Sequence, residues 1–543
     1  MNFKTILTAI TFGTSMSLSA VSVDSRIEGE PLDHYWETGV GAGRVNEGLR
    51  TGWQEHLADV KKHCGFKYVR MHGLFHDDMF VYFKQPNGKV KYNWQYIDDV
   101  YDRMLSMGVR PFVELGFFPK DMALPDSKTQ FWWKGNVSVD REKFGDWHDL
   151  IFAFVAHLVD RYGLDEVSKW YFEVWNEPNL TGTGAFFHGT KSDYFRLYKE
   201  AANAIKAVDR SLRVGGPATS NFVADARHDG EILDHSKSRF FSADKINKQK
   251  WHGVWINDFL RYCESENLPV DFISTHPYPT DYALDPEEGR SKGSIRYLNS
   301  LHDDIEWLQS ALASSKYPNA EIHLTEWSTS PNSRDCMHDL LPAAAYIIRA
   351  NLDCLGMAQS LMYWTFTDVF EEKGGAEKFF HGGFGLINFQ GIYKPTYHAY
   401  RMLHQLGDRL LHYDGTVAVS RYSDTGKIVV LAFNYPIEYE SHVPGAEDRD
   451  KYMNASPKHV NLTVSNLTPN TMFEVELLDS NHGDVSAAME SMALSESPTR
   501  EEIELLKNIS NGTLKKVVCS DDNGNLTFDE VLQPWACAMI KQI

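Results

Sequence analysis

Two glutamates in this chain of 543 residues each stand at the end of a short apolar run. Glu177 follows the run WYFEVW at residues 170–175, and Pro178 directly after it removes a backbone donor and ends the strand. Glu326 closes a second run, EIHLTEW, at residues 321–327. A glutamate in a structural ion pair would favour a basic residue next to it, and neither glutamate has one in the sequence. The alternative is that each is only a strand end followed by a polar turn. Two opposed carboxylates can protonate a leaving oxygen and attack an anomeric carbon, which is the chemistry of glycosidic cleavage.

The elements that must position these glutamates alternate between strands and helices. Short apolar runs and amphipathic stretches follow each other from residue 37 to residue 406, as in a parallel α/β fold. Strands are predicted at residues 39–44, 68–72, 111–115, 170–175, 212–216, 272–276, 322–325 and 361–365. Helices are predicted at residues 54–63, 96–106, 144–162, 194–208, 340–352 and 397–405. Eight such units favour a (β/α)8 TIM barrel, in which Glu177 closes the fourth strand and Glu326 the seventh, across the barrel axis from each other.

The pattern changes after residue 411. Short strands separated by Gly, Pro and Asn turns are predicted at residues 417–420, 427–434, 459–464, 472–478, 514–519, 525–532 and 536–541. They predict an all-β unit, a C-terminal β-sandwich domain of roughly 130 residues. The segment DDNGN at residues 521–525 is similar to a calcium loop, but it lacks the glycine and the glutamate that such a loop needs, so we interpret it as a hairpin turn.

Both the N-terminus and one internal stretch stand apart from these two units. Lys4, the mostly apolar residues 6–18 and the small residues after them form a secretory signal peptide, which predicts a secreted or periplasmic protein. About thirty polar residues at 222–254 follow the fifth strand, so they should project from the catalytic face, where they either wall the substrate pocket or stay disordered. The predicted organisation is a signal peptide at 1–22, a catalytic barrel at 23–410 and a sandwich domain at 411–543.

Charge and cysteine content exclude several classes of partner. A formal charge of -20 argues against nucleic acid, and after the signal peptide there is no uninterrupted apolar run for a membrane span. The six cysteines show no C-x-x-C pattern, so no metal site is expected. Cys519 with Cys537 is the most plausible disulfide pair, with buried free thiols as the alternative. The oligomeric state stays open, and a homo-oligomer is among the states allowed.

Six segments, taken together and in this order, resemble glycoside hydrolase family 39. They are VGAGRVNEGLR (40–50), VRMHGLFHDDM (69–79), WNEPN (175–179), STHPYPTD (274–281), TEW (325–327) and YWTFTDVFEE (363–372). That family is best known for β-xylosidases and α-L-iduronidases, and it belongs to a clan of retaining (β/α)8 enzymes. The resemblance runs from about residue 35 to 410, and a sandwich after the barrel is also typical of the family. The polar stretch after Asn221 departs from the family pattern.

The resemblance implies a retaining exo-glycoside hydrolase without a cofactor, in which Glu177 is the general acid/base and Glu326 the nucleophile. Asn176 is expected to hydrogen-bond the sugar 2-hydroxyl, and Trp364 to form the hydrophobic floor of the first subsite. Arg70 is interpreted as an ion-pair partner beneath the nucleophile and Glu114 as a structural hydrogen-bond acceptor. Further expected substrate contacts are His72, His276 and Tyr278, of which the last two would also orient Glu326.

An oligosaccharide substrate fits these residues, with β-xylosidase activity as the first hypothesis. An α-L-iduronidase would need cations facing the substrate carboxylate. The loop after the eighth strand offers Glu371 and Glu372 first, which accept hydrogen bonds from neutral sugar hydroxyls, although Lys373 and Lys378 follow. Another β-glycosidase activity also stays open. A non-catalytic sugar-binding protein is opposed by the presence of both glutamates.

Overall fold

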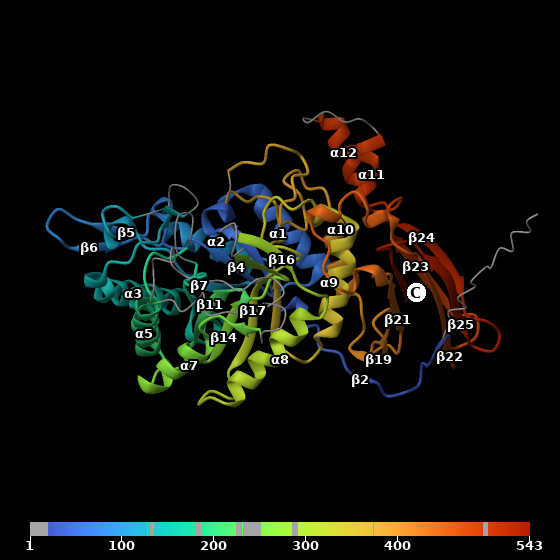
Figure 1. Ribbon diagram of the computed structural model, residues 1–543, viewed down its shortest axis with the longest axis horizontal. Coiled ribbons are helices and arrows are strands. Elements are labelled where there is room, and N and C mark those ends of the chain that lie inside the picture. Colours follow the sequence, from blue (N-terminus) through green and yellow to red (C-terminus); the bar gives the residue numbers. More distant parts are fainter. Residues whose placement is uncertain are drawn as a thin grey trace, which may run out of the picture.

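The computed structural model (Figure 1) describes residues 20–543 apart from 128, 131–134, 181–185, 224–230, 232–250, 285–290, 373 and 492–497. Nearly all of the predicted signal peptide lies outside the described residues, and so does most of the stretch 222–254.

Eight parallel strands form a closed barrel, which confirms the predicted fold class. Each strand pairs with its neighbours in chain order, and the last pairs with the first. Four of the eight are buried along their whole length and the other four at every residue but the first, because helices cover the outside and side chains fill the interior. The strands are β3 (Gly39–Arg44), β4 (Tyr68–His72), β7 (Arg110–Leu115), β10 (Tyr171–Val174), β11 (Arg213–Ser220), β14 (Phe272–His276), β17 (Glu321–Trp327) and β18 (Ser360–Tyr363).

Helices surround the barrel (Figure 1). They are amphipathic, and their apolar residues are the buried ones. They are α1 (Thr51–Cys64), α2 (Gln95–Ser106), α3 (Phe144–Tyr162), the short α4 (Leu164–Val167), α5 (Lys191–Val208), α7 (Ile256–Ser265), α8 (Ser300–Ala313), α9 (Leu341–Asp353) and α10 (Pro395–His404). Within the described residues, none of the helices has both the length and the apolar character of a membrane span.

Several loops between these elements contain small two-stranded hairpins. One of them, β12 with β13, joins the two ends of the stretch 222–254, so this stretch leaves and re-enters the fold at one place after β11. The hairpin strands are β5 (Tyr82–Lys84), β6 (Val90–Tyr92), β8 (Thr129–Gln130), β9 (Gly135–Asn136), β12 (Phe222–Val223), β13 (His252–Gly253), β15 (Thr280–Leu284) and β16 (Ser291–Ile295).

Two sheets form the C-terminal sandwich that the sequence predicted, with a hydrophobic core of their own. One has seven strands in the order β2-β19-β20-β21-β26-β23-β24, and the other has three in the order β1-β22-β25. Their bounds are β1 (Val21–Asp24), β2 (Glu30–Pro31), β19 (Arg409–Tyr413), β20 (Val417–Arg421), β21 (Ile428–Phe433), β22 (Lys458–Ser465), β23 (Met472–Leu478), β24 (Leu514–Cys519), β25 (Leu526–Leu532) and β26 (Cys537–Gln542).

The start of the described chain belongs to these sheets and not to the barrel. Strand β1 pairs in parallel with β22, and β2 pairs antiparallel with β19. Residues 21–31, which the sequence prediction divided between the signal peptide and the barrel segment, therefore complete the sandwich. The chain then crosses to the barrel, as the blue segment near β2 in Figure 1 shows.

Two helices, α11 (Ser486–Ser491) and α12 (Arg500–Ser510), interrupt the sandwich between β23 and β24. Helix α12 and the strand β23 before it both contact helix α10 of the barrel. Arg401 of α10 forms an ion pair with Glu476 of β23 at 2.6 Å, and His398 Nε2 donates to the Ser510 carbonyl oxygen at 2.7 Å. Helix α10 of the barrel thus forms part of the interface with the sandwich.

The predicted disulfide between Cys519 and Cys537 is wrong. In the paired sheet Cys519 lies opposite Met472 and Cys537 lies opposite Leu478, at the two ends of β23. Six residues of strand separate these positions by about 20 Å, far beyond the roughly 7 Å that a disulfide can span. Cys519 is exposed, Cys537 is buried and both are free thiols.

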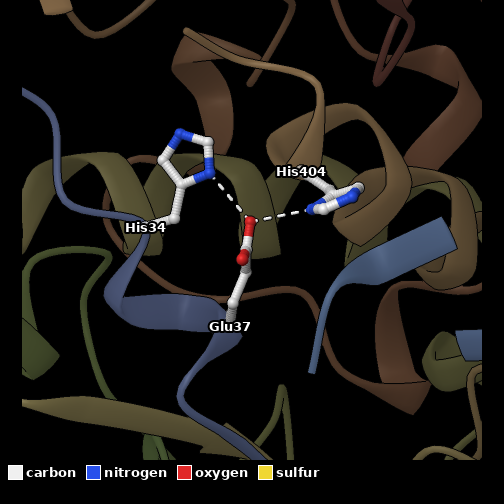
Figure 2. A group of neighbouring side chains, drawn as sticks. All are labelled: His34, Glu37 and His404. Atoms are coloured by element: carbon white, nitrogen blue, oxygen red, sulfur yellow. Dashed lines mark hydrogen bonds and ion pairs between the residues drawn. The ribbon is translucent and has the colours of Figure 1, made fainter. Parts of the chain in front are cut away.

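An ion-pair cluster lies next to the N-terminal end of barrel strand β3 (Figure 2). Glu37 ends the short helix η1 (Tyr35–Glu37), and one of its oxygens, Oε1, faces the Nδ1 atoms of His34 and His404 at 2.8 Å each. His34 Nε2 also lies 3.2 Å from the Gly407 carbonyl oxygen. The cluster therefore joins the segment before β3, the end of α10 and the connection to the sandwich.

Candidate active site

Glu177 and Glu326 come together at the C-terminal end of the barrel strands. Glu326 lies near the end of β17, and Glu177 follows β10 by three residues. Both are buried, with exposed fractions of 4% and 6%. One carboxylate oxygen of each, together with a ring nitrogen of His276, all lie within 4.8 Å of one another. The structure thus brings together the two glutamates that the sequence singled out.

A sharp turn after β10 aims Glu177 into the barrel mouth. Trp175 and Glu177 have φ angles of 73° and 44°, a left-handed conformation that side chains adopt only where the surroundings enforce it. Here the Glu177 N–H donates to the Ala218 carbonyl oxygen at 2.8 Å. Asn179 exchanges hydrogen bonds with the backbone of Ser220 at 2.8 and 2.9 Å. Glu177 and Asn179, the polar residues that follow β10, thus stabilise the turn by these hydrogen bonds.

Arg70 of β4 lies at the base of the site, fully buried. Its guanidinium donates to Glu326 Oε1 at 2.7 Å, so the predicted ion pair is present although no basic residue neighbours Glu326 in the sequence. The same guanidinium reaches Glu173 at 2.5 Å, Asn176 Oδ1 at 2.8 Å and Glu114 at 3.1 Å. One cation therefore holds three carboxylates and the amide next to Glu177 in fixed positions.

His276 and Tyr278 contact different glutamates. The Tyr278 hydroxyl donates to Glu326 Oε2 at 2.9 Å, as expected for a residue that orients the nucleophile. His276 was expected to do the same, but its Nδ1 lies 2.8 Å from Glu177 Oε1 and 3.7 Å from Glu326 Oε2. His276 therefore belongs mainly to the environment of Glu177.

Burial and charge act on the two glutamates in different proportions. Burial raises the pKa of Glu177 to about 7, against the lowering effects of a hydrogen bond with Ser220 and of the Arg70 charge. Burial also raises the pKa of Glu326, but the directly bonded Arg70 guanidinium opposes that rise. Among the described residues, Glu326 alone of the two has a guanidinium in direct contact, which favours its ionised form. A cation placed between the carboxylates would meet this guanidinium, so the pair suits proton transfer better than metal binding.

The remaining predicted contacts line the same space. Asn176 Nδ2 is buried and has no hydrogen-bond partner among the described residues, so it is a free donor for a ligand oxygen. The His72 ring packs 4.6 Å from the Trp364 ring, and its Nε2 lies 3.5 Å from Glu326 Oε1. His72 Nδ1 lies 2.6 Å from Glu114, which has the structural role predicted for it.

The loop after β18 differs from its prediction. Glu371 was expected to accept hydrogen bonds from sugar hydroxyls, but its two oxygens accept from Arg44 at 3.1 Å and from Arg50. Its charge is therefore already neutralised by residues of the segment VGAGRVNEGLR, whose arginines the sequence reasoning left without a role. Glu372 lies close enough to add to the rise in the pKa of Tyr278, which is caused first by burial and then by Glu326 and Glu177.

Comparison with known proteins places this site in a family. The model of "Glycosyl hydrolases family 39" matches residues 19–527. A β-xylosidase from Geobacillus stearothermophilus is 36% identical over 414 residues, which cover 75% of each chain. The crystal structure of a GH39 enzyme from Xanthomonas axonopodis pv. citri matches with a TM-score of 0.81 and 28% identity, over 98% of this chain and 99% of that chain. A monomeric β-xylosidase from Caulobacter crescentus CB15 matches with a TM-score of 0.80 and 31% identity, over 96% and 98%.

Proposed function

This chain belongs to glycosyl hydrolase family 39, and from that membership and the geometry of the site we propose that it is a retaining exo-acting β-xylosidase that releases xylose from xylo-oligosaccharides. The observation that carries the mechanism is the distance between the two glutamates. One oxygen of each lies within 4.8 Å of the other, which is short of the separation that lets an inverting enzyme place both the sugar and the attacking water between its carboxyl groups. The carboxylates of retaining enzymes lie about 5–5.5 Å apart, and those of inverting enzymes about 6.5–9.5 Å.

In the first step Glu326 attacks the anomeric carbon of the terminal xylose. The bond from that carbon to the leaving oxygen breaks, and the proton of Glu177 moves to the leaving oxygen. The products are a xylosyl ester of Glu326 and a shortened oligosaccharide. Arg70 and Tyr278 hold the attacking carboxylate by one hydrogen bond to each oxygen, which fixes its orientation before the reaction.

In the second step a water molecule attacks the same carbon. It gives a proton to the Glu177 carboxylate, and Glu326 leaves as a carboxylate. Two inversions at one carbon give net retention. The free amide N–H of Asn176 would bind the 2-hydroxyl, a contact that strengthens as positive charge develops on the sugar ring.

A neutral sugar fits the charges around the site better than a uronate. Arg44 and Arg50, the cations next to the loop after β18, are already paired with Glu371, and Arg44 also with Asp78 at 3.0 Å. A uronate would have to displace these carboxylates to gain an ion pair. Lys373, the first cation of that loop in the sequence, lies outside the described residues.

Product stereochemistry and a substrate panel test this proposal. Proton NMR of an aryl β-xyloside digest should show β-xylose first and the α anomer only as mutarotation proceeds. Among aryl β-xyloside, β-glucoside, α-arabinoside and α-iduronide, the β-xyloside should have the highest kcat/KM. First appearance of the α anomer would contradict retention, and a preference for the iduronide would replace the proposed substrate.

We also propose that the protein is exported, on the basis of the predicted signal peptide. Strand β1 begins at Val21, so cleavage just before this residue would leave the strand whole. N-terminal sequencing of the protein recovered from an exporting host should find a start close to Val21. Recovery of the chain with Met1 from the cytosol would contradict export.

A further inference from the structure

A chain of buried hydrogen bonds runs behind the acid/base glutamate. His276 Nε2 lies 3.1 Å from the Thr325 hydroxyl oxygen, and that hydroxyl lies 2.8 Å from Glu173 Oε1. The other oxygen of Glu173 accepts from Arg70 Nε at 2.5 Å. All four side chains are fully buried, so bulk water does not compete for these hydrogen bonds.

The direction of each hydrogen bond follows from counting protons. Burial alone would raise the pKa of Glu173, but the Arg70 guanidinium holds it below its usual value, so Glu173 is ionised and only accepts. The single proton of the Thr325 hydroxyl therefore points to Glu173. The Thr325 oxygen is then left to accept, and the donor that it faces is His276 Nε2–H.

The same count fixes the other ring nitrogen of His276. Burial lowers the pKa of His276 to about 4 although the nearby Glu326 charge favours the protonated ring, so the ring is neutral and carries one proton. With that proton on Nε2, the Nδ1 atom is bare, and it faces Glu177 Oε1 at 2.8 Å. A hydrogen bond at this distance needs a proton from Glu177.

We propose that Thr325 and Glu173 are positioning residues that fix the His276 tautomer with Nδ1 bare, so that the resting enzyme keeps the catalytic proton on Glu177. This inference rests on the proposed role of Glu177 as general acid/base. Both residues are fully buried, and their hydrogen bonds run to protein groups, which is why we assign them to positioning and not to substrate contact. Thr325 directly precedes the nucleophile in β17, and Glu173 lies in β10, the strand that leads to Glu177. Each of these two strands therefore supplies one catalytic residue and one residue that positions the acid.

The arrangement serves both steps of the reaction. In the first step the glycosidic oxygen competes with His276 Nδ1 for the proton of Glu177. In the second step, the ionised Glu177 faces a bare nitrogen, which is an unfavourable contact between two acceptors. Proton transfer from the attacking water restores the hydrogen bond to His276, so the network favours the return of Glu177 to its acid form.

Replacement of the Thr325 hydroxyl by a methyl group tests the proposal. In Thr325→Val the proton of His276 is free to move to Nδ1, where it would donate to ionised Glu177 and lower its pKa. We expect the basic limb of the kcat/KM profile for xylobiose to move down by about 1 pH unit, a tenfold change in proton affinity. Thr325→Ser is the matched control, because it keeps the hydroxyl and should keep the wild-type limb.

A second substrate separates this effect from a general loss of packing. An aryl xyloside with an acidic phenol needs little protonation, so Thr325→Val should change its kcat/KM much less than that of xylobiose. Equal losses on both substrates with an unmoved basic limb would overturn the proposal. Circular dichroism and the unfolding midpoint check that the variant is folded.

The tautomer itself is measurable without activity. In 15N spectra of histidine-labelled wild-type protein, with the His276 signal assigned by its loss in His276→Gln, we expect a protonated Nε2 and a bare Nδ1. A protonated Nδ1 would overturn the proposal even if Thr325→Val failed to fold. Absence of xylosidase activity in the wild type would instead contradict the proposed function and leave this spectrum as the test of the hydrogen-bond chain.

Discussion

At the scale of single residues, the two glutamates are distinguished by their partners and not by their burial. Glu326 receives Arg70 and Tyr278 as donors to its two oxygens, whereas Glu177 faces His276 and carries a pKa raised to about 7 by burial. In the proposed roles, the carboxyl group bound by two donors is the nucleophile, and the one with the raised pKa keeps a share of its protons at neutral pH as the acid. This division of roles is what double displacement requires.

Alanine variants should separate the roles through their leaving-group dependence. Glu326→Ala removes the attacking group, so every substrate should suffer. Glu177→Ala removes proton donation, which contributes about 10²–10⁴-fold, so xylobiose hydrolysis should collapse while the first step on an acidic aryl xyloside survives. Azide needs no general base, so it should restore turnover of the Glu177 variant and give the β-xylosyl azide.

The stereochemistry of the azide product is the internal control. With Glu326 removed, azide attacks the substrate directly and should give the α product. The β azide from the Glu326 variant together with the α azide from the Glu177 variant would reverse the assignment. Full activity of both variants on xylobiose would show that the active site lies elsewhere.

At the scale of elements, a strand can shape the pocket by having no side chain at a position where the neighbouring strand places a large one. Gly41 of β3 lies against the Trp364 ring, and a Cβ at this position would come within 2.2 Å of ring atom Cε3. Since Trp364 also packs on His72, its position depends on a missing side chain on the adjacent strand.

Gly41→Ala should therefore displace Trp364 and lower activity. A contact of 2.2 Å forces the ring or the strand to move, and such overpacking in a core costs about 1–3 kcal/mol. We expect a clear loss of kcat/KM on xylobiose together with a lower unfolding midpoint. The matched control is Gly52→Ala in α1, where a Cβ meets nothing within 4 Å. Wild-type kinetics of Gly41→Ala would show that the Trp364 position does not matter for the reaction.

Local pattern was sufficient to predict the barrel strands and the two glutamates at their ends, because strand periodicity and strand termination are written in neighbouring residues. It was not sufficient for contacts between distant segments. The pairing of Glu371 with Arg44 and Arg50, and the distance between Cys519 and Cys537, depend on how strands pair. The same holds for the hydrogen bond of His276, whose partner could not be chosen before the angle of its strand tip was known.

At the scale of the whole molecule, the sandwich is built from both ends of the described chain, with the barrel between them. Strands β1 and β2 cross from the start of the chain into the sandwich sheets, and Arg421 donates to the carbonyl oxygens of Ser25, Ile27 and Glu28. The sandwich is therefore closed by residues that precede the barrel.

Removal of residues 21–31 should destabilise the sandwich although it leaves every barrel strand in place. Strand β1 covers one edge of the three-stranded sheet and buries Val23 in its core. Without β1 the edge of β22 is unpaired, which invites proteolysis and aggregation. Limited proteolysis should cut the truncated protein within residues 411–543 sooner than the protein that starts at Val21. Equal cleavage rates would show that the sandwich closes without these strands.

The cluster in Figure 2 should make stability depend on acid. Burial alone would raise the pKa of Glu37, but His34 and His404 lower it from 4.5 to about 2. Because the folded value lies below the ordinary one, Glu37 contributes its stability above pH 4.5 and loses it as the pH falls toward 2, with an upper bound of about 3 kcal/mol. Glu37→Gln should lower the unfolding midpoint at pH 6, and its difference from wild type should shrink through that window. Glu55→Gln, at an exposed position of α1, is the matched control and should follow the wild type at every pH. A midpoint difference for Glu37→Gln that stayed constant down to pH 2.5 would mean that the carboxylate charge is not what joins these segments.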